Sequence, residues 1–503
     1  MSPADATLAA RPAGPQFHTW LQRVTTAANA ASSRLVDTHH QCLYGEVPAA
    51  LQAIQAHLAS LGVAAGDCVA VELNNSVAAA LLLLGLLDGG YGLVLSPARG
   101  NHRADPTVPA FCAWNVAVRT DAAARQGALQ DPASYLLARR NEAFARSDAV
   151  VRLADYVLLR SSGSLSVPKL VAHRPERLIG NALNVQARLQ LREHQRVSLP
   201  VPIFHMYGLG AGFLPALSAG ASIDFLEGAN VLTYLERERS FDPNVAFLTP
   251  TFCDFLLRVR RAPRRYDFVV SAGDTIAPSV FDRMEELHGP LLNLYGSTEM
   301  GSISVASGEL SPEVRRACAG SPYPGVQCRI AEGAFDEDAQ RGFGELQVRH
   351  EFGFEGYVDA EGRFIDVSTA FDAGWFRTGD YATAHADGTL RVLGRRDLSV
   401  KRNGVLLPLS DVEHRLREIA GVRQAAVAVG AESMRGRRLI AFCVPEEGAS
   451  LSGTEVRVRY AAGVPAYAVP DDVRIVAALP TLANGKVDRR ALGALAQQLE
   501  GGG

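Results

Sequence analysis

The residues of this chain that could do chemistry gather in five short segments. The first covers residues 160–173 and reads R-S-S-G-S-L-S-V-P-K-L-V-A-H, with serine hydroxyls around Gly163 and Lys169 beyond them. Hydroxyls and free backbone N–H groups in a turn can wrap phosphate oxygens, and a lysine adds a point charge. The segment does not match the G-x-x-x-x-G-K-[ST] phosphate loop, so phosphate binding and an exposed serine-rich turn are equal alternatives for this segment alone.

The second and third segments each contain a glycine followed within three residues by a carboxylate. Residues 293–299 read N-L-Y-G-S-T-E, in which Thr298 could reach a phosphate and Glu299 is a hard oxygen ligand suited to Mg²⁺ held between phosphates. Residues 375–380 read W-F-R-T-G-D, and Asp380 could hold the hydroxyls of a ribose. Taken alone, the second segment could be an ordinary strand-to-helix turn and the third a plain turn.

The fourth and fifth segments lie in the last quarter of the chain. Residues 394–397 read G-R-R-D and continue into S-V-K-R-N-G, and residues 482–489 read L-A-N-G-K-V-D-R. The fifth segment sets Lys486 on a glycine turn. A single lysine in such a place is usually surface charge, so this segment is informative only together with the other four.

In this order and spacing, the five segments resemble the signatures of the adenylate-forming superfamily, which includes acyl- and aryl-CoA synthetases, the adenylation domains of peptide synthetases, and luciferases. The resemblance covers residues 61–490. It implies an AMP-forming ligase that uses ATP and Mg²⁺ to activate a carboxylic acid as its acyl-AMP, with release of pyrophosphate. It also implies a second step, in which the acyl group passes to the thiol of CoA or of a carrier protein's phosphopantetheine.

The resemblance implies a nucleotide site assembled from several segments. The loop over residues 161–169 would close over the β- and γ-phosphates, Tyr295 would stack on the adenine, and Asp380 with Arg395 would hold the ribose. The full ATP-binding set would be Ser161, Ser162, Gly163, Ser164, Ser166, Lys169, Ala272, Gly273, Asp274, Tyr295, Gly296, Thr298, Asp380 and Arg395. The loop departs from the family pattern, which has a threonine and two glycines at the positions of Leu165, Ser166 and Leu170.

The resemblance also implies catalytic, metal-binding and hinge roles. Thr298 would contact the α-phosphate, Glu299 would bind Mg²⁺, and Lys486 would contact the carboxylate and the α-phosphate during adenylation. His205 is expected to join Thr298 and Lys486 as a catalytic residue. The two domains would rotate about Asp397 between the two steps.

The acid is expected to lie against residues 202–212, P-I-F-H-M-Y-G-L-G-A-G. Amino-acid-activating relatives carry an aspartate in the corresponding stretch, which pairs with the substrate ammonium, and this chain has no carboxylate there. An ammonium buried without a partner is costly, so we expect an uncharged acid that is aromatic or medium-sized and cyclic. The expected acid-binding residues are Phe204, His205, Tyr207, Gly208, Gly210, Gly296 and Met300.

Two features of this stretch allow alternative interpretations. His205 either lines the acid pocket or is a core histidine with satisfied hydrogen bonds. Gly208, Gly210 and Gly212 either leave room for a flat ring or allow close packing of the backbone.

The acceptor is open at this stage. CoA, the phosphopantetheine arm of a separate carrier protein and a free amine are all compatible acceptors. A stand-alone amino-acid-adenylating enzyme is an alternative function. Arg435, Arg437 and Arg438 form a basic cluster that could meet the phosphate of CoA or an acidic carrier helix, or be a solvated loop. Two other classes are a non-catalytic binding protein derived from a synthetase, suggested by the altered phosphate loop, and an oxidative enzyme of the luciferase kind.

Alternating strands and helices must position these segments over the first 300 residues, which predicts parallel sheets covered on both faces. The expected strands are residues 69–73, 91–95, 198–201, 221–225, 245–248 and 268–271, and a helix is expected over 76–87. Hairpins follow, with turns at Asp387–Gly388 and Asn403–Gly404. A helix over 409–419 and a strand over 424–429 then predict a small α+β domain.

The predicted fold is therefore α/β with several parts, because 503 residues exceed what one hydrophobic core usually supports. We expect a large N-terminal AMP-binding domain of stacked α/β sheets over residues 1–394, in which residues 342–394 form a β-rich subdomain. A hinge at 395–397 would lead to a small mobile C-terminal domain over 398–503.

Composition argues against several other classes of partner and location. A net charge of −3 without a basic stripe argues against a nucleic-acid partner. The longest apolar run, residues 77–87, is too short for a bilayer, which needs about twenty residues, so no membrane partner is expected. Seven scattered cysteines indicate reduced core thiols in a cytoplasmic protein. The oligomeric state stays open.

Overall fold

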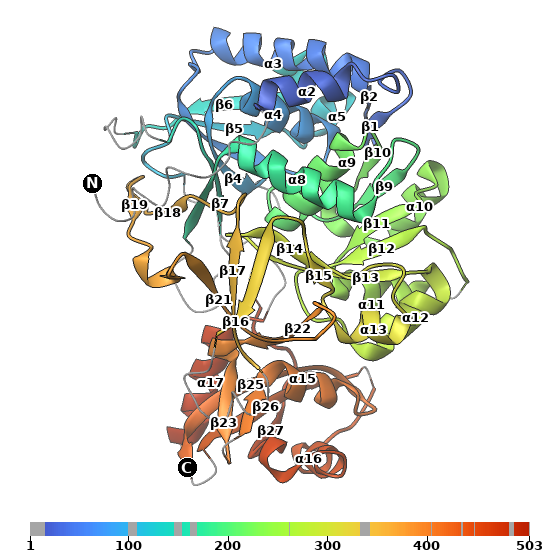
Figure 1. Cartoon of the computed structure of the whole chain (residues 1–503), viewed down its shortest axis with the longest axis vertical. Coiled ribbons are helices and arrows are strands. Elements are labelled where there is room, and N and C mark those ends of the chain that lie inside the picture. The colour runs from blue at the N-terminus through green and yellow to red at the C-terminus, as the bar shows by residue number, and fades with distance from the viewer. Residues whose placement is uncertain are drawn as a thin grey trace.

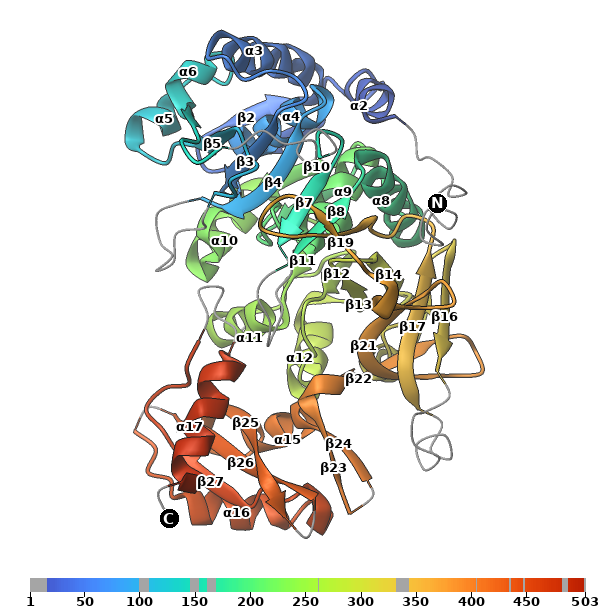
Figure 2. The same cartoon turned by 90° about the vertical axis from the view of Figure 1, so that its left-hand side faces the viewer.

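The computed structural model describes residues 16–98, 108–144, 153–160, 169–260, 262–331, 343–403, 405–433, 436–446, 448–481 and 487–501. Two α/β layers form the upper and middle parts of Figure 1, a β-rich sheet lies to the left of the lower layer, and a small domain forms the lower end. Figure 2 shows the same order after a quarter turn.

The first layer contains an eight-stranded sheet in the order β19-β18-β8-β7-β4-β3-β5-β6. Its strands are β3 (Cys68–Leu73), β4 (Gly92–Pro97), β5 (Trp114–Val118), β6 (Leu136–Arg140), β7 (Val157–Arg160), β8 (Leu170–His173), β18 (Gly356–Val358) and β19 (Phe364–Ile365). The four central strands, β7, β4, β3 and β5, are parallel. The chain passes from β3 to β4 on one side and returns in β5 on the other, so the strand order reverses between β3 and β5.

The second layer contains a nine-stranded sheet in the order β15-β14-β13-β12-β11-β9-β10-β1-β2. Its strands are β1 (Arg34–Val36), β2 (Gln41–Leu43), β9 (Arg196–Leu199), β10 (Ser222–Phe225), β11 (Val245–Leu248), β12 (Phe268–Ser271), β13 (Leu291–Ser297), β14 (Gly301–Val305) and β15 (Ser321–Pro322). The six strands from β1 to β13 along this order are parallel. Here the strand order reverses between β9 and β11.

Helices pack against both sheets. The α-helices are α2 (Phe17–Thr25), α3 (Val47–Ser60), α4 (Val77–Asp88), α5 (Ala122–Gln126), α6 (Pro132–Tyr135), α8 (Pro175–Leu189), α9 (Leu214–Ser218), α10 (Val231–Phe241), α11 (Pro250–Val259), α12 (Pro278–His288) and α13 (Pro312–Ala317). The large domain also contains the 3₁₀ helices η1 (Tyr44–Glu46), η3 (Glu227–Ala229) and η4 (Ser368–Ala370) and the π-helix η2 (Tyr207–Phe213). Helix α4 is buried around almost its whole circumference, which explains its nearly uniform apolar sequence. The Ser76 side chain caps it by accepting a hydrogen bond from the N–H of Ala79.

The β-rich sheet has the order β16-β17-β21-β20, with β22 paired to β21. Its strands are β16 (Val326–Ile330), β17 (Gly344–His350), β20 (Phe371–Asp372), β21 (Trp375–Ala384) and β22 (Leu390–Arg395). The sheet therefore takes in β16, ahead of the expected start at residue 342, while β18 and β19 join the eight-stranded sheet instead. Residues 375–380 belong to the long strand β21, so the plain turn considered for them is wrong.

The C-terminal domain contains a five-stranded sheet and its own hydrophobic cores. Its elements are η5 (Arg396–Leu398), β23 (Ser399–Arg402), β24 (Val405–Pro408), α15 (Leu409–Arg417), β25 (Val422–Ser433), β26 (Gly436–Pro445), α16 (Gly453–Ala461), η6 (Ala466–Ala468), β27 (Asp472–Ile475) and α17 (Arg489–Gly501). The cores of the large domain end at Leu390 and those of the small domain begin at Val400. A hinge at 395–397 stays a prediction, placed between two separately packed cores.

Most expected elements are present at or near their predicted positions. The strands over 245–248 and 268–271 have the predicted bounds, and the hairpins around Asp387 and Asn403 form. The strand expected over 198–201 instead ends at Leu199, because Pro200 cannot donate to a sheet. All seven cysteines are free, and six are buried. Among the residues that the structure describes, no helix is long and apolar enough to cross a bilayer.

Candidate functional site

The candidate site lies at the carboxyl ends of β9, β11, β12 and β13. The expected acid-binding stretch follows β9, residues 272–274 follow β12, and the turn over 298–300 follows β13. Open α/β sheets bind ligands outside the carboxyl ends of their strands where the strand order reverses. The reversal between β9 and β11 therefore favours a ligand at this edge of the nine-stranded sheet.

The turn over residues 298–300 is held by three buried groups. Its first carbonyl lies 2.7 Å from Nε2 of His173, its second accepts a hydrogen bond from the N–H of Phe354 at 2.7 Å, and its third lies 2.8 Å from Nδ1 of His350. A carbonyl can only accept, so each of these ring nitrogens carries a proton. Burial lowers the pKa of His173 to about 4, so this imidazole donates in its neutral form.

Glu299, the expected Mg²⁺ ligand, is joined to Lys169 through Tyr357. The Tyr357 hydroxyl donates a hydrogen bond to Oε1 of Glu299 at 2.9 Å. The Nζ of Lys169 lies 4.8 Å from the centroid of the same ring, within the range of a cation–π contact. Two side chains that the sequence places 130 residues apart thus meet on one phenol.

Tyr295 and Asp380, expected at the adenine and the ribose, are brought together. The Tyr295 hydroxyl donates to Oδ2 of Asp380 at 2.6 Å, and Nε of Arg395 lies 3.8 Å from Oδ1. Burial raises the pKa of Asp380, and the Tyr295 hydrogen bond and the Arg395 charge oppose that shift. The same arginine donates to Asp397 at 3.1 Å, so the expected ribose-binding pair is contiguous with the expected hinge.

The loop after β12 faces the C-terminal domain. Gly273 has a φ of 97°, which side-chain-bearing residues rarely adopt, and Asp274 beside it is exposed. Arg489, at the start of α17, forms a two-pronged ion pair with Glu413 of α15. Burial lowers the pKa of Arg489, but Glu413 and, across the domain boundary, Asp274 together raise it. The small domain therefore approaches the expected adenine side of the site.

The glycines of the acid-binding stretch serve close packing. A Cβ added to Gly208 would lie 2.1 Å from the carbonyl oxygen of Pro202, and one added to Gly212 would lie 2.4 Å from Cδ1 of Leu199. At Gly210 the distance to Sδ of Met206 would be 2.7 Å. All three are far below ordinary contact distances, so the close-packing interpretation of these glycines is the one that the structure supports.

The other expected acid-binding residues are placed differently from one another. The Tyr207 hydroxyl lies 3.0 Å from the Leu248 carbonyl oxygen and 2.9 Å from that of Val270, and its single proton serves one of them at a time. His205 is exposed, with its ring 4.6 Å from that of Phe204, so the core-histidine alternative is wrong. Gly296 is exposed, whereas Met300 is buried, with 1% of its surface accessible.

Several expected site residues lie outside the described residues. They are Ser161, Ser162, Gly163, Ser164, Leu165 and Ser166 of the phosphate loop, together with Lys486 and Arg435. Thr481 and Val487, the described residues that flank residues 482–486, pair with each other in an isolated antiparallel bridge. Arg437 of the basic cluster donates twice to the carbonyl of Gly430, so its guanidinium is engaged by its own hairpin.

A metal site made by protein groups alone is absent from the described part of the chain, where no three His, Cys, Asp or Glu side chains gather. Glu299 is a single carboxylate, with Oε1 engaged by Tyr357. Mg²⁺ is usually held by one or two carboxylates together with substrate phosphates. The donor set here therefore fits Mg²⁺ that arrives with a nucleotide.

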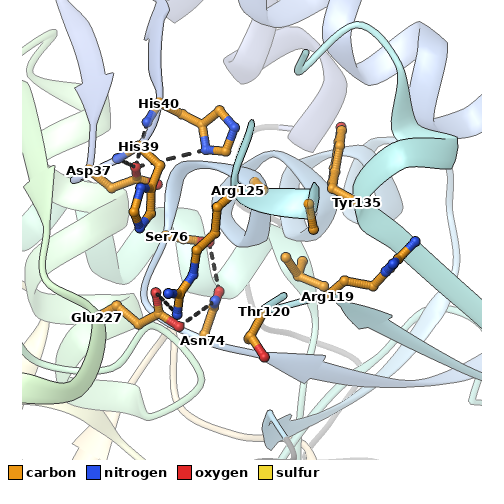
Figure 3. Close-up of a pocket in the computed structure, with 13 residues that line it drawn as sticks. Asp37, His39, His40, Asn74, Ser76, Arg119, Thr120, Arg125, Tyr135 and Glu227 are labelled. Carbon is orange, nitrogen blue, oxygen red and sulfur yellow. Dashed lines mark hydrogen bonds and ion pairs between the residues drawn. The ribbon is translucent and has the colours of Figure 1, made fainter. Parts of the chain in front are cut away.

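A separate polar cavity of about 20 Å³ lies where the eight-stranded sheet reverses its strand order, beyond Asn74 and Val118 (Figure 3). Asp37 follows β1 of the other sheet, and its carboxylate lies at the N-terminus of α4, beside this cavity. Its Oδ2 accepts from the N–H of Val77 at 2.7 Å, and its Oδ1 accepts from the N–H groups of His39 and His40, both at 2.7 Å. The remaining volume suits about one water molecule.

Sequence reasoning missed Tyr357, His173 and His350. Tyr357 stands in F-E-G-Y-V and His350 in V-R-H-E-F, which give no local sign of a site. His173 ends the first segment, but only pairing of β8 with β18 and the approach of the 298–300 turn give it a role. A contact that depends on three distant segments has no signature in one of them.

Comparison with known proteins gives two family matches in chain order. A family model of the AMP-binding enzymes matches residues 115–358, and a model of the AMP-binding enzyme C-terminal domain matches residues 411–486. Together these matches cover more than half of the chain.

Individual relatives agree with the family. The chain is 26% identical over 467 residues to the "Anguibactin system regulator" of Vibrio anguillarum, covering 86% of this chain but only 43% of that protein. It is 28% identical over 361 residues to the "Indoleacetate--CoA ligase" of Aromatoleum aromaticum, covering 70% of this chain and 69% of the relative. The structure of ATP-bound MatB from Rhodopseudomonas palustris has the same fold, with a TM-score of 0.78 and 19% identity over 96% of this chain and 99% of that one. The chain belongs to the AMP-binding enzymes.

Proposed function

We propose that this chain activates a carboxylic acid with ATP as its acyl-AMP and then transfers the acyl group to a thiol. The observation that carries the proposal is the assembly around Glu299. Lys169 and Glu299 meet on Tyr357, while Tyr295, four residues before Glu299, donates a hydrogen bond to Asp380. Four separate stretches of the sequence, residues 169, 295–299, 357 and 380, thus supply a cation, the carboxylate expected to bind Mg²⁺, and the residues expected at the adenine and the ribose.

In the first step a carboxylate oxygen of the acid attacks the α-phosphorus of ATP, the bond to the bridging oxygen breaks, and pyrophosphate leaves. Thr298 contacts the α-phosphate, and Lys486 holds the carboxylate and the α-phosphate, two anions that otherwise repel. Lys169 and the serines of its loop hold the β- and γ-phosphates. Mg²⁺ bound by Glu299 and the phosphates would neutralise charge on the departing pyrophosphate.

In the second step a thiolate attacks the acyl carbon, AMP leaves with the electron pair of the broken mixed-anhydride bond, and a thioester forms. CoA or the phosphopantetheine of a separate carrier protein is the proposed acceptor, and the ligase named among the relatives supports CoA. Transfer to an amine uses the same adenylate and is the alternative outcome. The acid is proposed to be an uncharged aryl or acyl acid, because residues 202–212 hold no carboxylate to pair with a substrate ammonium.

Acid-dependent exchange of labelled pyrophosphate into ATP tests the first step, over a panel of aryl, fatty and amino acids. We expect exchange with at least one aryl or acyl acid, and loss of most of it in Glu299→Gln, which keeps the shape of the side chain and removes its charge. Exchange with a free amino acid alone would overturn the acid class. Nucleotide binding without exchange for any acid would instead favour a non-catalytic binding protein, to which the altered phosphate loop also points.

A further inference from the structure

Among the contacts described above, one side chain, Tyr357, touches both Lys169 and Glu299. Its hydroxyl donates to Oε1 of Glu299, and its ring lies under the Lys169 ammonium. We propose that Tyr357 is a positioning residue for adenylation, which fixes the Glu299 carboxylate for Mg²⁺ and keeps it apart from the phosphate-loop lysine. This inference rests on the proposed function and adds a residue to it.

The position of Tyr357 follows from strand register. In the antiparallel pair of β18 with β8, Tyr357 lies opposite Val171. Side chains alternate along a strand, so Lys169, two residues before Val171, lies on the same face as Tyr357 and diagonally across from it. That spacing is within reach of a long side chain, which explains the contact between the ammonium and the ring.

The phenol ring is itself held in place by a neighbouring aromatic side chain. Phe354 packs against it, with the ring centroids 5.0 Å apart, and is 2% exposed. The N–H of Phe354 donates to the carbonyl of Glu299 at 2.7 Å. Segment 354–357 therefore donates two hydrogen bonds to Glu299, one from the Phe354 N–H to its carbonyl and one from the Tyr357 hydroxyl to its carboxylate. Together they fix the carboxylate relative to its own backbone.

The chemistry explains why a neutral phenol suits this place. Terminal carboxylate rotation is loosely restrained in glutamate, and a free carboxylate beside an ammonium tends to form an ion pair. A hydroxyl that donates to Oε1 orients the group and leaves Oε2 for the metal. A ring face attracts the ammonium without neutralising it. The Lys169 ammonium thus stays available for the phosphates and the Glu299 carboxylate for the metal.

Tyr357→Phe is the direct test, since it keeps the ring and removes only the hydroxyl. Binding of ATP is measured by calorimetry at a series of Mg²⁺ concentrations, without any acid, so that no reaction occurs. A hydrogen bond to a charged group is worth enough for about a tenfold effect, so the Mg²⁺ concentration for half-maximal binding should rise about tenfold. Tyr135→Phe is the matched control, because it removes one buried hydroxyl, bonded to the Leu129 carbonyl at 3.0 Å, far from Glu299.

A double-mutant cycle separates positioning from general structure. If Tyr357 acts through Glu299, Glu299→Gln combined with Tyr357→Phe should shift the Mg²⁺ dependence no further than Glu299→Gln alone. Additive shifts would overturn the proposal, as would a wild-type Mg²⁺ dependence in Tyr357→Phe while Glu299→Gln is impaired; in both cases the proposed function stands. An unchanged Mg²⁺ dependence in Glu299→Gln would remove the metal role of Glu299 itself, and the inference with it.

Discussion

His173 should make the large domain measurably less stable in acid. The folded protein holds this imidazole neutral, with burial lowering its pKa from 6.5 to about 4. In the unfolded chain the same group protonates near its ordinary value. Between these two pKa values the unfolded state binds more protons, so the contribution of His173 to stability is complete above pH 6.5 and is lost as the pH falls toward 4. A difference of this size corresponds to about 3 kcal/mol.

His173→Gln is the perturbation that isolates this effect. A glutamine amide can donate to the Thr298 carbonyl as Nε2 of His173 does, but it does not titrate. Both proteins share every other titrating group, including His288, whose pKa burial also lowers to about 4. The difference between their stabilities should therefore change by about 3 kcal/mol between pH 7 and pH 4, in favour of the variant at low pH.

Urea unfolding followed by tryptophan fluorescence measures this difference in the large domain, because Trp20, Trp114 and Trp375 all precede the expected hinge. Nitrogen chemical shifts of labelled histidine give a second reading, in which His173 should stay neutral, with its proton on Nε2, at pH 5. Parallel stability curves for the two proteins from pH 7 to pH 4, or a charged His173 at pH 5, would show that His173 does not make this contribution.

Three further outcomes are expected. Lys486→Ala should slow acyl-AMP formation by about 10²-fold, as loss of a transition-state charge contact does, and leave transfer from synthetic acyl-AMP near normal; equal losses in both half-reactions would contradict its role. Asp397→Pro should restrict rotation by fixing φ, so that acyl-AMP still forms while transfer slows at least tenfold, or about 1.4 kcal/mol; single-turnover assays decide, and wild-type transfer would place the hinge elsewhere. Gly208→Ala should destabilise the large domain by about 1–3 kcal/mol, because its Cβ would meet the Pro202 carbonyl at 2.1 Å. In thermal unfolding, Gly308→Ala, with open space around its Cβ, is the control.

Local pattern was enough to predict most of the fold. Short apolar runs bounded by glycine or proline predicted β11 and β12 to the residue, and the turn residues around Asp387 and Asn403 predicted two hairpins. The sheet to which a strand belongs was not predictable in the same way. Strand β18 follows β17 along the chain but pairs with β8, because its partner is decided by packing across about 190 residues of sequence.

The candidate site likewise contains residues that the sequence predicted and residues whose place only packing decides. Residue types and their order predicted Lys169, Glu299, Tyr295 and Asp380, and the structure brings these residues together in two groups. The groups that hold them, such as Tyr357 and His173, act through one contact each and carry no motif. The glycines of residues 208–212 show the reverse case, since a pattern compatible with an open pocket proved to serve close packing.

The Asp37 carboxylate at the N-terminus of α4 has a consequence for where a nucleotide phosphate could bind. Two strand-order reversals in one chain offer two places where a phosphate would ordinarily settle. At one of them, a phosphate would have to displace an internal anion that already accepts three backbone N–H groups, and would be repelled by it. A carboxylate of the chain itself thus already occupies the place that a phosphate would take at this reversal. Because Asp37 follows a strand of the neighbouring sheet, its hydrogen bond to the N–H of Val77 also joins the two layers.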